Sequence, residues 1–252
     1  MKKSMKRIRL FLQGFLMVNL IWFFAYLLMD TKVIPNPIQV YQKMPTIIST
    51  KVIFHIYHSL SRIMMGLMYS LIVGIPTGIL MAYSKKANEL LYPLIYFTYP
   101  IPKTALLPVA MLLLGMRDAS KILIIFLIIV FQVIVAVRDS VNQINPVMYQ
   151  VIHSTGANFW QTICHVTLPA ILPQLLTSIR VSLGTAISIL FFVEGYGTKY
   201  GMGYYIIDAW SRIQYVEMYI GIIVISVVGF VLFILVDMLS NKLCNWSSPK
   251  VN

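Results

Sequence analysis

Few side chains of this sequence could do covalent or metal chemistry, and their spacing favours neither. Six residues make up the set: His55, His58, His153, His165, Cys164 and Cys244. An enzymatic nucleophile needs an adjacent base, and a metal site needs several ligands that converge. The six residues show no such arrangement, and the sequence has no G-x-x-x-x-G-K-[ST] phosphate loop. We therefore expect no catalytic residue, no metal and no cofactor in this chain.

The composition indicates that the chain is folded mostly in lipid. Of its 252 residues, 59% are hydrophobic and 11% are charged, which is more apolar surface than a soluble domain of this size can bury. Because one crossing takes about 20 apolar residues, there is room for roughly five to seven spans. The net charge of +12 comes from basic residues near the span ends, which indicates membrane orientation and not nucleic-acid binding.

We expect an all-α polytopic membrane protein with about six transmembrane helices. The expected spans are 10–29, 60–83, 90–114, 122–137, 170–192 and 218–239. Pro35 and Pro37 break any helix that follows the first span, and 39–58 could form an interfacial helix. Gly74 and Gly78 have the spacing that lets a neighbouring helix approach closely. Four prolines interrupt the third span, which favours either a pore-facing wall or a kinked helix that only packs.

The basic N-terminus sets the expected orientation. A cluster of lysines and arginines at 2–9 precedes the first span and is normally retained in the cytoplasm. The first apolar run is too long for a signal peptide and no cleavage site closes it. Six spans then place both termini in the cytoplasm. The expected units are 1–59 (tail, first span and outer interfacial segment), 60–242 (a core of five spans) and 243–252 (a cytoplasmic tail).

Charged side chains within the apolar runs are the remaining chemically distinctive group. Buried charge is costly in lipid, so such a residue usually faces a cavity or a partner. Arg62 lies at an end of its span, and we expect its side chain to snorkel to the membrane surface. Lys103, Arg180 and Glu194 are candidates for a translocation path or for pairing between conformations. The alternative is a structural ion pair between helices.

A polar, aromatic segment broken by glycine separates the fourth and fifth spans. Asn145 can cap a first short helix, which Gly156 can end by taking a positive φ. Asn158 can cap a second helix, and Pro169 then restarts the chain as the fifth span. We interpret 145–169 as a cytoplasmic helix–glycine–helix elbow at the membrane surface. Its aromatic residues suit a partner groove or the lipid headgroups.

This elbow resembles the cytoplasmic signature loop of permease subunits in ABC importers. Gly156, Ala157 and Leu168-Pro169 match the glycine and Leu-Pro of that loop, whereas Gln150-Val151-Ile152 stands where Glu-Ala-Ala is usual. Nearly the whole chain is similar to permeases of the nitrate, sulfonate and taurine importer family. The other matching stretches are IPNP at 34–37, HSLSR at 58–62, VGIPTG at 73–78, PIPKTALLP at 100–108, GMRDASK at 115–121, and Glu194 followed by GMG at 201–203.

The resemblance implies a type I ABC importer permease fold with the elbow as coupling helices. It implies a subunit of the bacterial inner membrane that translocates a small solute by alternating access, while a separate ATPase binds ATP. The implied partners are two ATPase subunits, a second permease chain in a homodimer and an external binding protein. The implied solute is a sulfonate-, nitrate- or taurine-like anion or a thiamine-precursor-like pyrimidine. The implied ATPase contacts are Gln150, His153, Ser154, Thr155, Gly156, Ala157, Phe159 and Trp160.

Two other classes of function remain alternatives. An autonomous secondary transporter would need internal repeats and intramembrane ion sites, but we find no convincing repeat and few acidic groups at mid-span. A membrane-embedded enzyme would need a nucleophile–base pair or a metal cluster, but the histidines lie at span edges or in the elbow and Glu194 has no obvious partner. Transport without ATP would favour the transporter, and activity without an ATPase would favour the enzyme.

Overall fold

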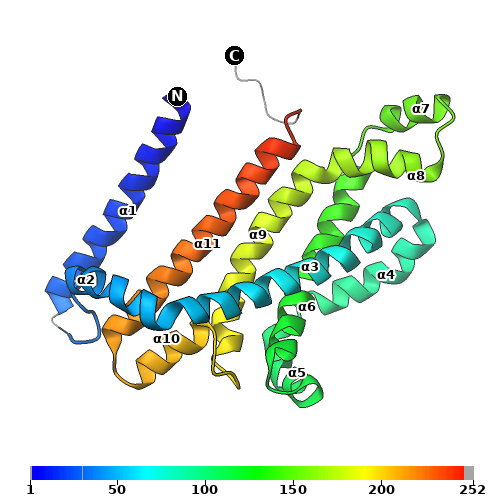
Figure 1. The fold of residues 1–252 in the computed structure, drawn as a ribbon. Coiled ribbons are helices and arrows are strands. Elements are labelled where there is room, and N and C mark those ends of the chain that lie inside the picture. Colours follow the sequence, from blue (N-terminus) through cyan, green and yellow to red (C-terminus); the bar gives the residue numbers. More distant parts are fainter. Residues whose placement is uncertain (1, 30, 247–252) are drawn as a thin grey trace.

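Helices form every regular element in the part of the chain that the structure describes. The computed structural model describes the backbone of residues 2–29 and 31–246, with side chains from residue 13 onward. The basic side chains of 2–9 and tail residues 247–252 lie outside this part. The helices are α1 (Lys2–Met29), α2 (Pro37–Ile47), α3 (Ile53–Tyr83), α4 (Lys85–Thr98), α5 (Leu107–Leu114), α6 (Asp118–Asn142), α7 (Pro146–Ser154), α8 (Phe159–Thr162), α9 (Leu168–Glu194), α10 (Met202–Ser211) and α11 (Tyr215–Leu243). The expected all-α architecture is confirmed (Figure 1).

The apolar helices agree with most of the expected spans. Among the described residues, four helical stretches are long and apolar enough to cross a bilayer: Pro37–Tyr83, Asp118–Asn142, Phe159–Glu194 and Tyr215–Leu243. The pair Lys85–Thr98 and Lys103–Leu114, bent by 85° at its break, is a fifth if it is counted as one span. The apolar stretch Gln13–Met29 of α1 is near the lower limit of about 17 residues for a crossing.

The second helical region is longer than predicted. We expected an interfacial helix at 39–58 and a separate span from residue 60. Instead α2, a π-helical turn at Ile48–Val52 and α3 form one helix of 47 residues. At about 1.5 Å per residue this helix is about 70 Å long, more than twice the hydrocarbon thickness, and it runs obliquely across the other helices (Figure 1). No break marks the boundary expected between 1–59 and 60–242.

The fifth span also begins differently from the prediction. The second elbow helix continues through a π-helical turn at Ile163–Thr167 into α9, so that Phe159–Glu194 is unbroken. Pro169 is the second residue of α9, two residues after that π-helical turn, a position where its missing N–H is tolerated. The expectation that Pro169 restarts the chain is therefore wrong.

Glycines on α3 set its close packing against α6. A β-carbon added at Gly74 would lie 2.7 Å from Val133, and one added at Gly78 would lie 2.7 Å from Val137. Gly66 extends the same stripe, because its added β-carbon would lie 2.5 Å from the Ile125 side chain. The close approach predicted from the glycine spacing is confirmed. It brings α3, α6 and α9 together around the largest apolar core cluster.

The ends of the bundle carry different elements. The start of α1, the end of α11 and the short helices α7 and α8 lie at one end, which we call the elbow end (Figure 1). Helices α5 and α10 lie at the opposite end. The start of α1 and the end of α11 therefore lie on the same side as the elbow, as the six-span topology predicts.

Candidate functional site

The elbow has the local geometry that its sequence predicts. The Asn145 side chain accepts a hydrogen bond from the backbone N–H of Val147 at 3.0 Å and caps α7. Gly156 has a φ of 77°, which a residue with a side chain rarely adopts. Asn158 and Gln161 then form a reciprocal capping box at the start of α8. These caps supply hydrogen-bond acceptors for backbone N–H groups at the starts of α7 and α8. Side chains of the elbow itself therefore stabilise its turn.

Tyr83 at the end of α3 packs against the elbow. The Tyr83 hydroxyl lies 2.6 Å from the Thr167 hydroxyl. The Tyr83 ring meets the Phe159 ring edge-on at 5.6 Å and the Tyr149 ring edge-on at 6.2 Å. The elbow is therefore in contact with α3 through Tyr83 and is continuous with α9. The sequence did not single out Tyr83.

The residues implied as ATPase contacts lie together on the elbow and are mostly exposed. Trp160 is 72% exposed and Phe159 is 53% exposed, which is unusual for rings of this size. Gln150, His153, Ser154, Thr155 and Gly156 are exposed and Ala157 is partly buried. The elbow from 145 to 169 contains no Asp, Glu, Lys or Arg. Its surface is aromatic and uncharged.

A second polar site lies near the opposite end, at the boundary of α9 and α10. Glu194 is fully buried and accepts hydrogen bonds from the Ser59 hydroxyl, the Arg62 guanidinium and the backbone N–H of Gly203. We call Ser59, Arg62, Asp118, Glu194 and Gly203 the Arg62–Glu194 cluster. It joins α3, α6, α9 and α10, which are distant in sequence. The expectation that Glu194 has no partner is wrong.

Arg62 is the hub of this cluster. It is 1% exposed, so the expectation that it snorkels is wrong. Its guanidinium donates to Asp118 through Nε at 2.9 Å and Nη2 at 2.6 Å, and to Glu194 through Nη1. It also donates to the Tyr200 carbonyl at 2.8 Å and to the Thr198 hydroxyl at 3.2 Å. These bonds occupy all five N–H groups of the guanidinium, which makes its burial tolerable.

The two glycines of the GMG stretch form the wall around Glu194. Gly201 has a φ of 129°, and a β-carbon there would lie 2.3 Å from the Glu194 carboxyl carbon. A β-carbon at Gly203 would lie 2.5 Å from the Phe191 carbonyl oxygen. The His55 ring, also from the long helix, accepts a hydrogen bond from the Gly201 N–H at 3.1 Å. Residues larger than glycine would displace α10 from the carboxylate.

The other charged candidates do not join this cluster. Arg180 pairs with Asp237 of α11 at 3.1 Å, and both side chains are about half exposed. Lys103 donates to the carbonyls of Thr98 and Tyr99 at 2.6 and 2.7 Å, at the end of α4. Arg180 and Glu194 are fourteen residues apart on one helix, or about 21 Å, so they do not meet. Arg180 and Glu194 each form an ion pair with a residue of another helix, which is the structural role given above as the alternative to a translocation path.

Three residues of functional interest were not singled out from the sequence. Ser59 and Asp118 belong to the cluster, and Lys121 is fully buried beside it with its Nζ 2.7 Å from the Met116 carbonyl. One signal existed: Ser59 and Arg62 lie one helical turn apart, and so do Asp118 and Lys121. A polar pair of this spacing lies on one face of its apolar helix, and the two pairs, one on α3 and one on α6, suggest a common polar partner.

Known proteins resemble this chain along most of its length. The family model described as binding-protein-dependent transport system inner membrane component matches residues 74–244. The taurine transport system permease protein TauC of Escherichia coli K12 is 32% identical over 219 residues, which is 84% of this chain and 80% of TauC. The formylaminopyrimidine transport permease protein ThiX of Halalkalibacterium halodurans is 26% identical over 233 residues, which is 92% of this chain and 93% of ThiX.

A solved structure has the same fold. A chain of the MetNI methionine ABC transporter in an inward-facing conformation superposes with a TM-score of 0.67 at 16% identity. The match covers 76% of this chain and 95% of that chain. The overall helical fold of this chain is therefore one already seen in a solved structure.

Proposed function

The chain belongs to the family of binding-protein-dependent transport system inner membrane components and is the permease subunit of an ABC importer, and from this premise we propose that residues 145–169 dock on its ATPase. The observation that carries the proposal is the exposed aromatic elbow. It is capped at both helix starts and supported by Tyr83 on α3. Movement of the ATPase subunits would therefore be transmitted to two spans at once.

The exposed elbow residues fit a protein groove better than lipid headgroups. Aromatic side chains are enriched in the centres of protein interfaces, where charged residues are depleted. A helix that lies on a bilayer surface usually carries Lys or Arg on its polar face. The elbow has exposed rings and no such cation. The proposed ATPase contacts are Gln150, His153, Ser154, Thr155, Gly156, Ala157, Phe159 and Trp160.

The charged candidates receive separate roles in this proposal. The buried Glu194 holds α10 and the long helix together near the opposite end. Arg180 and Lys103 remain candidates for the translocation path, Arg180 because it is half exposed on a span and Lys103 because it lies beside the break in the third span. Each would contact solute only while the path is open to it.

The proposed assembly contains two copies of this chain, two ATPase subunits and an external binding protein. The elbow and both termini would lie in the bacterial cytoplasm, and α10 would face outward. The chain would make and break no covalent bonds itself, since ATP hydrolysis belongs to the ATPase. The solute would be a small anion or a pyrimidine, as the names of the taurine and formylaminopyrimidine permeases suggest.

A co-purification experiment tests the docking role. The wild-type protein is isolated from detergent-solubilised membranes and its partners are identified by mass spectrometry. We expect an ATPase with the wild type and none with Gly156→Pro, because proline cannot take the positive φ at that turn. Gly115→Pro is the matched control, because Gly115 has a similar φ of 81° at the other end of the bundle. An intact wild-type protein that recovers no ATPase would favour the autonomous transporter.

A further inference from the structure

One exposed face of the spanning helix α9 is polar along most of its length. Gln174, Thr177, Val181, Thr185 and Ser188 follow one another at steps of three or four residues and are exposed or partly exposed. We call these five residues the open face of α9. The opposite face of the helix is buried in the largest apolar core cluster. The open face therefore belongs to a span but lacks the apolar side chains that lipid favours.

The outer face of α11 shows what a lipid-facing surface of this chain looks like. The exposed side chains of α11 from 222 to 235 are aliphatic or aromatic except Ser226. The Ser226 hydroxyl donates to the Ile222 carbonyl at 2.8 Å. Lipid can therefore cover α11 without leaving a polar group unpaired.

Lipid cannot cover the open face of α9 in the same way. The hydroxyls of Thr177, Thr185 and Ser188 donate to carbonyls of their own helix, so they are paired. The Gln174 amide differs, because no hydrogen bond to it is found within the described residues. At the edge of this face the Arg180 side chain is 50% exposed, although it lies near the middle of the helix. Polar groups exposed along a span face water or a partner.

Gln132, near the middle of α6, adds hydrogen-bond donors beside this face. Its Oε1 accepts a hydrogen bond from the Ser182 hydroxyl of α9 at 2.9 Å. Ser182 is fully buried, so its hydroxyl needs this acceptor. The bond fixes the amide with Oε1 toward Ser182, and the two N–H groups on Nε2 have no partner within the described residues. Gln132 is only partly buried, so these donors are available to a molecule on the open face.

Water suits these groups better than a second protein chain does. A partner helix packed against the open face would have to place a polar group opposite Gln174 and another opposite Gln132. It would have to keep both there in every state of a transport cycle. Water pairs with both amides in any state, and polar side chains in spans commonly mark such water-filled paths.

We propose that the open face of α9 and Gln132 line a water-filled solute path, and that Gln132 directs its N–H donors into this path. A passing solute replaces the water at Gln132 through a hydrogen-bond acceptor atom. This inference rests on the proposed importer function. It adds one wall of the path and the group that meets the solute near mid-span.

Thiol labelling at two matched valines tests the water-filled wall. Cys164→Ser with Cys244→Ala provides the background for two variants, Val181→Cys and Val227→Cys. Both valines lie near the middle of a spanning helix, and they are 64% and 54% exposed. The full chain in membranes, with its ATPase, is treated with a negatively charged thiosulfonate that reaches only hydrated thiols. We expect Val181→Cys to react at least about tenfold faster than Val227→Cys.

Slow labelling would identify another occupant of the open face. Equally slow reaction of the two variants would overturn the water-filled wall. A disulfide between two copies of Val181→Cys on oxidation would then identify a second chain as the cover, and its absence would identify lipid. ATPase recovery is measured on the same samples. If the ATPase is recovered but both thiols react slowly, only this inference fails and the proposed docking stands.

The charge selectivity of the same reaction tests Gln132. A positively charged thiosulfonate is applied in parallel to Val181→Cys with and without Gln132→Glu, which keeps the acceptor for Ser182 but replaces the N–H donors by a carboxylate. We expect the ratio of the negative to the positive reagent's rate to fall by about threefold or more. Gln143→Glu is the matched control, because Gln143 is exposed at the end of α6, about 16 Å further along the helix.

Two results would remove Gln132 from the path. One is an equal change of the ratio with Gln132→Glu and with the Gln143→Glu control. The other comes from Gln132→Cys, which keeps the test open if Gln132→Glu is not recovered with the ATPase. Its thiol should react as fast as that of Val181→Cys, and a rate as slow as that of Val227→Cys would place residue 132 outside the path.

Discussion

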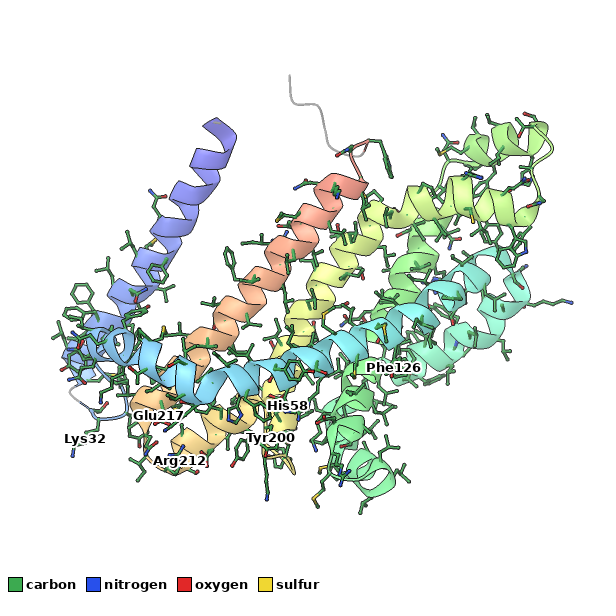
Figure 2. All side chains as sticks on the ribbon, viewed as in Figure 1. Lys32, His58, Phe126, Tyr200, Arg212 and Glu217 are labelled. Carbon is green, nitrogen blue, oxygen red and sulfur yellow. The ribbon has the colours of Figure 1, made fainter. Side chains whose placement is uncertain are left out.

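Glu194 at the end of α9 is in direct contact with Arg62 on α3, and neither side chain reaches solvent. The two residues are 132 positions apart in the chain. Their pair sits where α3, α6, α9 and α10 converge near the end opposite the elbow. Figure 2 shows Tyr200, whose carbonyl the same guanidinium binds, beside His58 at that end of the molecule.

The first prediction concerns this pair. Glu194→Gln leaves the Arg62 charge with Asp118 as its only carboxylate partner, and we expect a loss of about 3–5 kcal/mol in the free energy of unfolding. Adding Arg62→Met to Glu194→Gln removes the buried charge that has lost one of its two carboxylate partners, so the double variant should be more stable than Glu194→Gln. Thermal unfolding in detergent measures both. Additive losses in the double variant would contradict direct pairing.

The second prediction compares two glycines with positive φ. Gly201→Ala places a methyl group against the Glu194 carboxylate, whereas at Gly115 an added β-carbon meets nothing within 4 Å. Because Gly115 has a φ of 81° and a ψ of 172°, we expect Gly115→Ala to cost about 1–3 kcal/mol from backbone strain alone. Gly201→Ala should cost clearly more, because a displaced carboxylate leaves Arg62 poorly paired. Protein yield and thermal unfolding of the two variants provide the comparison, and equal effects would argue against the wall around Glu194.

The third prediction concerns the elbow surface. Trp160→Ala removes an exposed ring that the proposed docking buries, and we expect ATPase recovery to weaken by about tenfold or more. Trp246→Ala is the control, since Trp246 is 62% exposed but lies outside the elbow. Quantitative co-purification measures both. Full recovery with Trp160→Ala would move the docking surface elsewhere.

The fourth prediction follows from the lack of charge in 145–169. Salt at about 1 M screens exposed ion pairs almost completely, but it does not weaken apolar burial. ATPase recovery should therefore change by less than about twofold between about 0.1 M and 1 M salt. Lys85 and Lys86, at the start of α4 just after Tyr83, carry nearby charges and would form only a rim. Loss of the ATPase at high salt would show that such rim charges dominate.

The fifth prediction separates the two cysteines. Cys164 is exposed on the elbow, whereas Cys244 is buried just beyond α11, and burial raises the pKa of its thiol. Because the thiolate is the reactive form, Cys244 should react slowly at neutral pH and faster as the pH rises. An impermeant maleimide should label Cys164 in inside-out vesicles and not in intact cells. Labelling in intact cells would reverse the proposed orientation.

Local signals in the sequence were sufficient for the elbow. Caps at Asn145 and Asn158 and a glycine turn act over four residues or fewer, so their geometry is fixed by neighbours in the chain. The apolar runs likewise determined the all-α membrane fold, because lipid leaves few other structures for the backbone. The glycine spacing on α3 also predicted its close packing against α6, because only small residues let two helices approach so closely.

Tertiary structure decided what lies between distant segments. The sequence shows Arg62 and Glu194 only as two isolated charges, and whether Arg62 snorkels or pairs depends on where α9 ends relative to α3. The 47-residue helix could not be foreseen either, because proline at 37 starts a helix as readily as it breaks one and the turn at Ile48–Val52 hides the junction. The sequence determined the solvent, the helices and the elbow. Packing alone determined which buried charges meet, because burial in lipid forces each to find a partner that only the assembled bundle provides.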